Sequence, residues 1–408
     1  MRYAVCLLLG CGDPESIADS SEDSSANTDS ETSDDGTDSA APGRYATGIH
    51  IDRIEANQGV AVALAENGEL ILPESRPVGL IHGRPTLIRA YWTLDASWTP
   101  RDILADLILT APDGATGTRR CAIVVDGPPD AESIEGAFYW RLHAEDVIPG
   151  TRFAIELKET AHSQKGTSKP ELGARTPKTG DADMGIGDAT MTLDMVLVPL
   201  IPPGRDSVPI EAADKTAVET ALMELLPVQE ISVDWQPAQP QSKFYEHPEE
   251  AWRDIHDLRA ALGLAPDDYL HVLLDPTTCC NNEAFDFTGL GGNAGATQDD
   301  EDSNKRSAMV MIKEDVASAA LFIVHELGHN HGLKHAPCGD VDKLDHAYPY
   351  PNGLTHTQGY GILSDKLHSG DPTISHPYYD MMTYCWPVWF SDYNFEAMRK
   401  RIELVSSW

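Results

Sequence analysis

Residues 325–335, with the sequence HELGHNHGLKH, decide how the second half of this chain folds. They follow the apolar run 319–324, which predicts the buried start of a helix. Residues four apart on a helix lie on the same face, so His325 and His329 can direct their imidazoles at one point. The stretch therefore predicts an apolar helix with two histidines on one face.

The end of the same stretch supplies the rest of a metal site. Gly332 tolerates the backbone conformation that ends a helix and turns the chain, which brings His335 in as a third ligand. Three neutral imidazoles leave the fourth tetrahedral position of Zn²⁺ to water, as in catalytic sites. Glu326 lies next to the ligand face and can take a proton from that water. We predict one zinc ion held by His325, His329 and His335, with Glu326 as the catalytic base.

His331 needs a separate interpretation. Its two-residue offset from His329 points it away from the ligand face, so we expect it to support the ligands from behind or to face solvent. The competing interpretation of the whole stretch is a surface helix with incidental histidines. That interpretation does not explain why all the positions of a zinc hydrolase pattern are filled.

Length and charge limit the protein class. The chain has 408 residues, enough for two domains with cores of their own. Its 30 basic and 65 acidic residues give a formal charge of −35, which repels phosphate backbones and anionic lipid surfaces. We expect no nucleic-acid partner, and we interpret the charge as a source of solubility rather than as attraction to a cationic substrate.

Residues 44–190 have the pattern of a β-rich domain. Runs of period-two alternation, such as 48–54 and 86–92, are separated by turn signals such as Asn67-Gly68. This pattern predicts an antiparallel β-sandwich. No histidines, cysteines and carboxylates are grouped there at ligand spacing, so we assign this domain no chemistry. Residues 162–190, rich in Gly, Lys, Thr and Asp, indicate a long loop or linker.

Residues 191–408 alternate between strand-like and helix-like segments. The expected strands are 195–201, 231–235, 269–275 and 308–312, and the expected helices are 211–226, 248–262 and a closing helix at 394–405. Together with the β-rich domain this predicts an α+β protein, whose second domain has a mixed sheet and carries the zinc site.

The first 43 residues indicate export. Residues 1–11 combine a basic residue, a short apolar run and Leu-Leu-Gly-Cys, which resembles a bacterial lipoprotein signal. In that family Cys11 would become the lipidated first residue, although the apolar run is at or below the usual lower limit of about 7 residues. A buried N-terminal strand is the alternative. Residues 12–43 are acidic and rich in Ser, which predicts a disordered tether. We expect a cell-envelope lipoprotein or extracellular protein, attached to a membrane only through the lipid.

The pattern His-Glu-x-x-His-x-x-Gly-x-x-His resembles that of the metzincin metalloproteases, which also carry a methionine turn beneath the metal. Residues 380–384, DMMTY, look like that turn, with Met382 as the methionine and Met381 as the alternative. In several metzincin branches a tyrosine two residues later binds the metal at rest or stabilises the tetrahedral intermediate. The resemblance therefore implies a catalytic role for Tyr384, and the competing interpretation makes it a packed aromatic side chain.

A narrower resemblance is to the secreted bacterial enzymes typified by dictomallein and the mucin-cleaving metalloproteases. It rests on residues 83–89, GRPTLIR, on the HNHG end of the helix, and on residues 379–385, YDMMTYC, which run into 389–393, WFSDY. The similarity spans about residues 46–408. It implies a protein or glycoprotein substrate, which composition and spacing do not show.

The resemblance also implies a disulfide bond. Cys338 lies three residues after the third ligand and Cys385 three after the turn methionine, and a metzincin fold would bring both loops under the same metal. We therefore expect a Cys338–Cys385 disulfide, which an exported compartment permits. Cys121 lies in a strand-like run and is expected to be buried in the core. Cys279 and Cys280 receive no assignment.

Three other segments bear on ligand binding. Residues 299–302, four consecutive acidic residues, could bind Ca²⁺, but a solvated acidic loop is the simpler interpretation. Residues 289–292, GLGG, are not followed by a phosphate-binding helix and indicate a mobile loop near the cleft. A substrate in extended conformation is expected to lie beside an edge strand near 308–312.

Two classes of function remain open at this stage. The first is a monomeric, exported zinc endopeptidase that acts on surface or extracellular proteins. The second is a surface binding or adhesion protein with a vestigial zinc site, although such a protein would not need Glu326. Hydrolysis of a non-peptide amide by the same chemistry is a third alternative.

Overall fold

The structure is a computed structural model that describes residues 44–160, 163, 165–206, 210–241, 243–245, 248–275, 289–312 and 316–408. Its mixture of sheets and helices confirms the predicted α+β class. The expected signal at 1–11, the expected tether at 12–43, and Cys279 and Cys280 lie outside the described residues.

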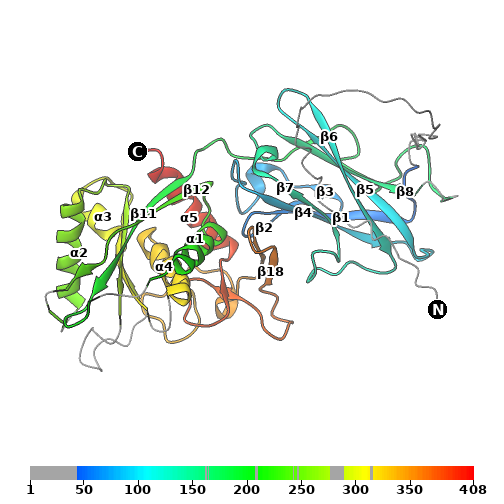
Figure 1. Cartoon of the computed structure of the whole chain (residues 1–408). Coiled ribbons are helices and arrows are strands. Elements are labelled where there is room, and N and C mark those ends of the chain that lie inside the picture. Colours follow the sequence, from blue (N-terminus) through cyan, green and yellow to red (C-terminus); the bar gives the residue numbers. More distant parts are fainter. Residues whose placement is uncertain are drawn as a thin grey trace, which may run out of the picture.

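Two antiparallel sheets form the N-terminal part (Figure 1). The first has the order β3 (Glu69–Leu70), β2 (Ala61–Glu66), β1 (Ile49–Asn57), β4 (Thr86–Leu94) and β7 (Phe138–Leu142). The second has the order β10 (Ala182–Asp183), β8 (Arg152–Glu159), β5 (Arg101–Thr110) and β6 (Thr116–Val125), with β9 (Arg175–Thr176) paired to β8. Ile54 and Ile88 of the first sheet share a hydrophobic cluster with Leu107 and Ile155 of the second. The alternating pattern thus gives two sheets on a common core.

The predicted turn at Asn67 and Gly68 connects β2 to β3, and both residues have positive φ, 52° and 74°. Such angles match the hairpin turns that Asn-Gly favours. The interpretation of residues 162–190 as a loop or linker is wrong in part, because β9 and β10 both pair with β8. Strands of two residues are too short to show an alternating pattern, so the sequence gives no signal for them.

The C-terminal part is built on a second kind of sheet. Its order is β12 (Glu230–Trp235), β11 (Thr192–Ile201), β14 (Tyr269–Leu274), β16 (Ser307–Met311) and β15 (Gly289–Gly291), with β13 (Gln239–Pro240) beside β11. The pairs are parallel except β15 with β16. Tyr269 and Leu273 belong to the main core, whereas Leu270 and Val272 belong to a second hydrophobic cluster. Alternate residues therefore face opposite sides of the sheet.

Helices cover both faces of this sheet (Figure 1). Helices α1 (Ala212–Leu225) and α4 (Val316–Asn330) contribute Leu222 and Ile323 to the main core, and α2 (Pro248–Leu262) contributes Ile255 to the second cluster. The helices predicted at 211–226 and 248–262 are confirmed within one residue, and the apolar run 319–324 lies in α4, which begins three residues earlier among the described residues. Among the described residues, no helix is long and apolar enough to cross a membrane.

The predicted position of the edge strand is wrong. Residues 308–311 fall in β16, which lies between β14 and β15. The strand at this edge of the sheet is β15, within residues 289–292, where the sequence indicates a loop. A three-residue strand with two glycines has neither alternation nor β propensity, so only the tertiary pairing shows it.

The acidic residues 299–302 also differ from the expectation of a solvated loop. They open helix α3 (Asp300–Lys305), where the Asp299 side chain accepts a hydrogen bond from the Asp302 backbone N–H. The Asp302 carboxylate accepts bonds from the backbone N–H groups of Gly295 and Thr297. The Asp299 oxygen caps the start of the helix and the Asp302 oxygens hold the segment before it. Ca²⁺ binding remains without support.

A hairpin and a closing helix complete the C-terminal part. The elements are α5 (Asp392–Val405), the hairpin β17 (Gln358–Gly361) with β18 (Lys366–Ser369), the pair β19 (Tyr379–Asp380) with β20 (Val388–Trp389), and the 3₁₀ turns Pro73–Ser75, Ala144–Asp146 and Pro351–Gly353. The closing helix begins two residues before the predicted 394, because Ser391 caps it through the Asn394 N–H. The hairpin reaches the first sheet, where Asn57 Nδ2 donates to the Gln358 carbonyl at 2.8 Å.

Arg84, within the stretch 83–89, joins the two parts. Its fully buried guanidinium donates to the Gln58 carbonyl at 2.6 Å and to the Val228 carbonyl at 2.7 Å. It also donates to the carbonyls of Met223 and Glu224, at the end of α1. Helix α1 packs against α4, so the first sheet supports the helix that carries the histidines.

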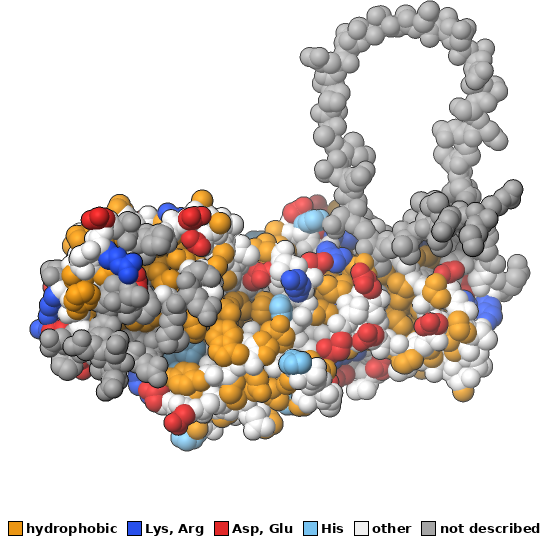
Figure 2. Space-filling model, turned by 60° about the horizontal axis from the view of Figure 1, so that its bottom comes forward, with side chains coloured by type: hydrophobic (Ala, Val, Ile, Leu, Met, Phe, Trp, Pro, Cys, Tyr) orange, Lys and Arg blue, Asp and Glu red, His pale blue; other side chains and the backbone are white. Residues whose placement is uncertain are grey.

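Figure 2 shows one face of the molecule, on which acidic side chains are scattered and hydrophobic side chains gather in the middle.

Candidate metal centre

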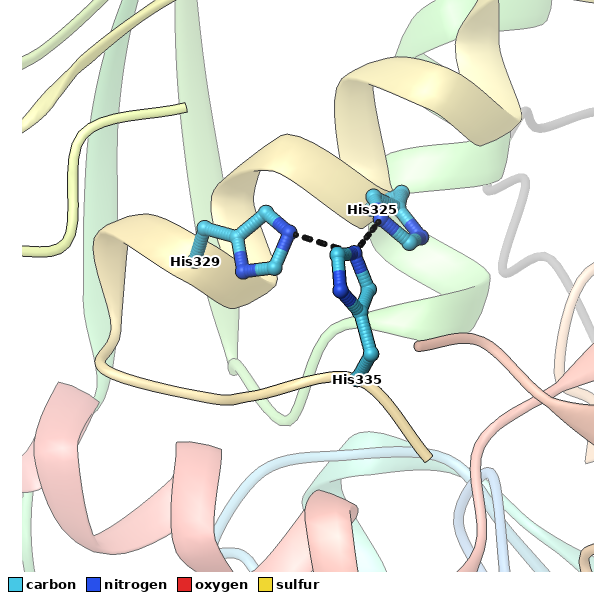
Figure 3. A group of neighbouring side chains, drawn as sticks. All are labelled: His325, His329 and His335. Atoms are coloured by element: carbon cyan, nitrogen blue, oxygen red, sulfur yellow. Dashed lines mark hydrogen bonds between the residues drawn. The ribbon is translucent and has the colours of Figure 1, made fainter. Parts of the chain in front are cut away.

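The three predicted ligands lie together (Figure 3). His325 and His329 project from one face of α4, and Gly332, with a φ of 86°, turns the chain so that His335 faces them. The Nε2 atom of His335 lies 3.3 Å from that of His325 and 3.1 Å from that of His329. The three ligand atoms lie within 4.8 Å of one another, so these residues form a site that could hold a metal ion.

The other nitrogen of each ring fixes its orientation. His325 Nδ1 lies 2.8 Å from the Met381 carbonyl, and His329 Nδ1 lies 3.0 Å from the Leu333 carbonyl. His335 Nδ1 lies 2.5 Å from the Asp342 carbonyl. A carbonyl only accepts hydrogen bonds, so each Nδ1 carries the proton and each Nε2 presents a lone pair.

This arrangement fits zinc. Three lone pairs that point at one another repel unless a cation lies between them. Zinc–nitrogen bonds of about 2.0–2.1 Å in a tetrahedral site place the nitrogens about 3.3 Å apart, close to the two short separations found here. Burial, together with the neighbouring imidazoles, lowers the pKa of His325 to about 3. Burial likewise lowers the pKa of His329 to about 4, so both rings are neutral and ready to bind a metal at neutral pH.

Glu326 lies beside the ligands, 4 % exposed, and lines a cavity of about 540 Å³ with them. Its Oε2 finds no hydrogen-bond partner among the described residues. Burial raises the pKa of this carboxyl to about 8. A carboxyl group with such a pKa is well matched to proton transfer near neutral pH.

Strand β15 packs directly on Glu326. A Cβ atom at Gly289 would lie 2.5 Å from Glu326 Oε1, and one at Gly291 would lie 2.8 Å from both the Glu326 carbonyl and Oε2. No side chain fits at either position without displacing the carboxylate. The expectation that residues 289–292 lie near the cleft is therefore correct, whereas their assignment to a loop is not.

Met382, predicted as the turn methionine, lies directly under α4. A Cβ at Gly328 would overlap the Met382 sulfur, and the Met382 carbonyl accepts from the Ala336 N–H at 2.8 Å. The predicted Cys338–Cys385 disulfide is confirmed, with a Cα–Cα distance of 5.7 Å. The disulfide ties the loop after His335 to the segment after Met382. Cys121, also as predicted, is fully buried.

Sequence reasoning missed Asp380, which anchors the Met382 turn. Its fully buried carboxylate accepts from the Met382 N–H at 2.8 Å and from Asn394 Nδ2 at 2.8 Å. It also accepts from the Ser391 N–H at 2.9 Å and the Ser391 hydroxyl at 2.5 Å. Only the tertiary fold brings the start of α5 to this carboxylate, so no local pattern predicts the contact.

Tyr384 lies at the rim of the cavity, half exposed. Its ring centroid is 4.8 Å from that of His335, and its hydroxyl donates to Asp342 Oδ1 at 3.3 Å. Burial and the Asp342 carboxylate raise the pKa of Tyr384 to about 12, so its hydroxyl is protonated and can donate a hydrogen bond at neutral pH.

His331 lies outside the ligand group, as predicted, but it does not face solvent. It is 2 % exposed, stacks on Tyr269 and bonds through Nδ1 to the Leu327 carbonyl at 2.6 Å. The next residue back, Asn330, has a role that the sequence did not indicate. Its amide bonds to His271 at 2.9 Å and to the Gly292 carbonyl at 2.7 Å, so it holds the end of α4 against β14 and β15.

One wall of the cavity is apolar. Leu321 and Phe322 come from α4, and Trp386 and Val388 come from the segment after the disulfide. Phe322 and Trp386 meet edge to face with centroids 5.8 Å apart, and Trp386 is 51 % exposed. The cavity thus combines an apolar wall with a polar end at the histidines.

Comparisons with known proteins add little to this geometry. No protein-family model matches the sequence, and no curated protein matches it either. Among solved structures, metalloproteinase-II from Bacteroides fragilis is similar at 12% sequence identity and a TM-score of 0.30, over 78% of this chain and 79% of that one. A similarity at this level shows neither family nor activity, so the function proposed below rests on the residues of this chain.

Proposed function

We propose that this chain is a zinc-dependent endopeptidase of the metzincin type that cleaves exported or surface proteins. The observation that carries the proposal is the convergence of three imidazole Nε2 atoms beside the buried carboxylate of Glu326 in one cavity. His325, His329 and His335 would hold the metal. When bound, a zinc ion supplies Lewis acidity, which makes water more acidic and polarises a carbonyl group.

The residues of the chain supply the remaining functions. The Glu326 carboxylate takes a proton from the attacking water and returns it to the leaving amine. The protonated hydroxyl of Tyr384 exchanges its bond to Asp342 for a hydrogen bond to the oxygen that gains charge. Leu321, Phe322 and Trp386 bind an apolar part of the substrate and exclude water from it. Beside them, β15 has an edge that an extended peptide could pair with.

Export is supported by one feature of the structure. The Cys338–Cys385 disulfide is typical of an oxidising compartment. We propose that the chain acts in the cell envelope or outside the cell as a monomer, with lipid attachment at Cys11.

The test is proteolysis by the purified full chain. Wild type and Glu326→Ala are incubated with casein and with a mucin-type glycoprotein, each with and without a zinc chelator, and bound metal is measured. We expect about one zinc ion per chain in both proteins, and a loss of cleavage of about 10²- to 10⁴-fold in the variant. Cleavage by Glu326→Ala at the wild-type rate would contradict the mechanism. Zinc binding without any cleavage would favour the binding-protein alternative.

A further inference from the structure

Asp342 contacts both the third histidine and the tyrosine at the rim. Its carbonyl accepts from His335 Nδ1 at 2.5 Å, and its carboxylate Oδ1 lies 3.2 Å from the same nitrogen. The same Oδ1 accepts from the Tyr384 hydroxyl at 3.3 Å. One side chain therefore links a candidate metal ligand to a candidate catalytic residue on a different segment.

The backbone around Asp342 holds this carboxylate in place. The loop closes on itself, because His335 and Leu344 form a parallel bridge and the Asp345 N–H donates to the His335 carbonyl at 2.7 Å. The Tyr384 N–H donates to the Cys338 carbonyl at 3.1 Å, next to the disulfide. The Asp342 side chain is 66 % exposed, so fixed backbone contacts rather than burial set its position.

The contacts of Asp342 with His335 and with Tyr384 each have a chemical consequence. A carboxylate near the protonated Nδ1 of a ligating histidine fixes the tautomer and makes Nε2 a stronger ligand, and removal of such a partner costs about 10- to 100-fold in metal affinity or activity. The bond to Asp342 holds the Tyr384 side chain at the rim before a substrate arrives, and the single hydroxyl proton then exchanges Asp342 for the substrate oxygen as its acceptor. The neighbouring Asp340 is also acidic and exposed, but among the described residues it makes no hydrogen bond or ion pair.

We propose that Asp342 is a positioning residue of the metal centre, which strengthens His335 as a ligand and holds the Tyr384 hydroxyl at the cavity. The proposal rests on the zinc function proposed above. It assigns to Asp342 an action through its two neighbours and no contact with the reacting atoms.

The first measurement is zinc affinity of the metal-free full chain, by competition with a chromophoric chelator. We expect Asp342→Ala and Asp342→Asn to bind zinc about tenfold or more weakly than wild type, because both remove the charge near His335. Asp340→Ala and Asp340→Asn remove the same charge from the same loop and are expected to bind as wild type does. Circular dichroism of each variant establishes that it is folded.

The second measurement separates the contact with Tyr384. At saturating zinc, Asp342→Ala is expected to lower kcat about tenfold with little change in KM, and the same substitution is expected to lower it much less in the Tyr384→Phe background. Asp342→Asn keeps an oxygen that can accept from Tyr384, so it should recover most of kcat but not the zinc affinity.

The outcomes are distinct from those that test the proposed function. Wild-type zinc affinity in Asp342→Ala, or additive losses of kcat in the double variant, would overturn the role of Asp342 while the endopeptidase proposal stands. If the wild-type chain itself binds no zinc, the endopeptidase proposal fails first.

Discussion

The cleft, which contains Glu326, and the floor beneath it, formed by the Met382 turn and Asp380, surround their buried carboxylates differently. Glu326, in the cleft, has one carboxylate oxygen with no hydrogen-bond partner among the described residues. Asp380, in the floor, accepts four hydrogen bonds from Met382, Ser391 and Asn394. Burial raises the pKa of both groups. A bond from the Gly291 backbone opposes this rise at Glu326, and four hydrogen bonds oppose it at Asp380.

This difference distinguishes Asp380, which stabilises the fold, from Glu326, which we propose takes part in catalysis. An unsatisfied buried carboxylate costs free energy and persists only where the surrounding structure enforces it. The floor provides that structure, because Asp380 fixes the Met382 turn and Met382 packs under Gly328 of the histidine-bearing helix. The fully partnered Asp380 thus helps to fix the helix that carries the proposed base Glu326.

Removal of the floor carboxylate should have the largest effect on stability. Asp380→Ala leaves four donors without an acceptor in a fully buried site, so we expect the free energy of unfolding to fall by about 3–5 kcal/mol. Glu326→Gln should not lower it, because a carboxyl with a pKa of about 8 is mostly neutral at pH 7 and a neutral amide of similar shape replaces it. Urea denaturation of the metal-free proteins at pH 7 measures both.

The matched control for this comparison is Asp102→Ala. Asp102 is an exposed acid on β5 whose side chain makes no hydrogen bond or ion pair in the described part of the chain, so its loss should change stability by less than about 0.5 kcal/mol. A stability of Asp380→Ala equal to that of Asp102→Ala would contradict the role of the floor.

The sequence predicts what depends on local spacing. The helical offset of His325 and His329, the glycine that turns the chain, and the third histidine all lie within eleven residues, so the ligand group could be predicted without a fold. The helices follow likewise, because each is long enough to show a helical period, and β14 and β16 follow from short apolar runs.

The sequence does not predict what depends on contacts between distant segments. Asp380 meets Asn394 only through the fold, and β15 is recognisable only from its pairing with β16. The short β9 and β10 are likewise recognisable only from their pairing with β8. The Cys338–Cys385 disulfide is the exception, because the family resemblance supplied the missing long-range information.

A smaller effect should follow when a methyl group is added between β15 and Glu326. At Gly291 the new Cβ would lie 2.8 Å from the Glu326 carbonyl, so the strand or the carboxylate must move. We expect Gly291→Ala to cost about 1–3 kcal/mol of stability and to lower kcat about tenfold, since a displaced base works poorly. Thermal unfolding and steady-state kinetics measure the two effects.

Gly117→Ala is the control for Gly291→Ala. Gly117 is also a strand glycine, in β6, but a Cβ there would meet no atom within 4 Å. The control should keep wild-type kinetics and stability. Wild-type kinetics in Gly291→Ala would show that the close approach of β15 does not hold Glu326.

The smallest effect concerns a carboxylate that is partnered but exposed. Asp365, in the turn of the β17–β18 hairpin, accepts from Arg141 of the first sheet at 2.6 and 2.9 Å and from the Tyr360 hydroxyl at 2.7 Å. Burial opposes the ionised form, but these bonds outweigh it and lower the pKa of Asp365 below 3.8. Because the pair is 31 % and 46 % exposed, solvent screening limits its contribution to less than about 1 kcal/mol.

The lowered pKa gives this last contribution a definite pH dependence. A carboxylate whose pKa is lower in the folded state stabilises the fold fully above its unfolded pKa of about 4, and this stabilisation is lost as the pH falls toward the folded pKa. Asp365→Asn should therefore be less stable than wild type at pH 7, and the difference should shrink between pH 5 and pH 3. Urea midpoints of both proteins over this range measure it. An equal difference at pH 7 and pH 3 would mean that the ionised carboxylate of Asp365 does not hold the hairpin to the first sheet.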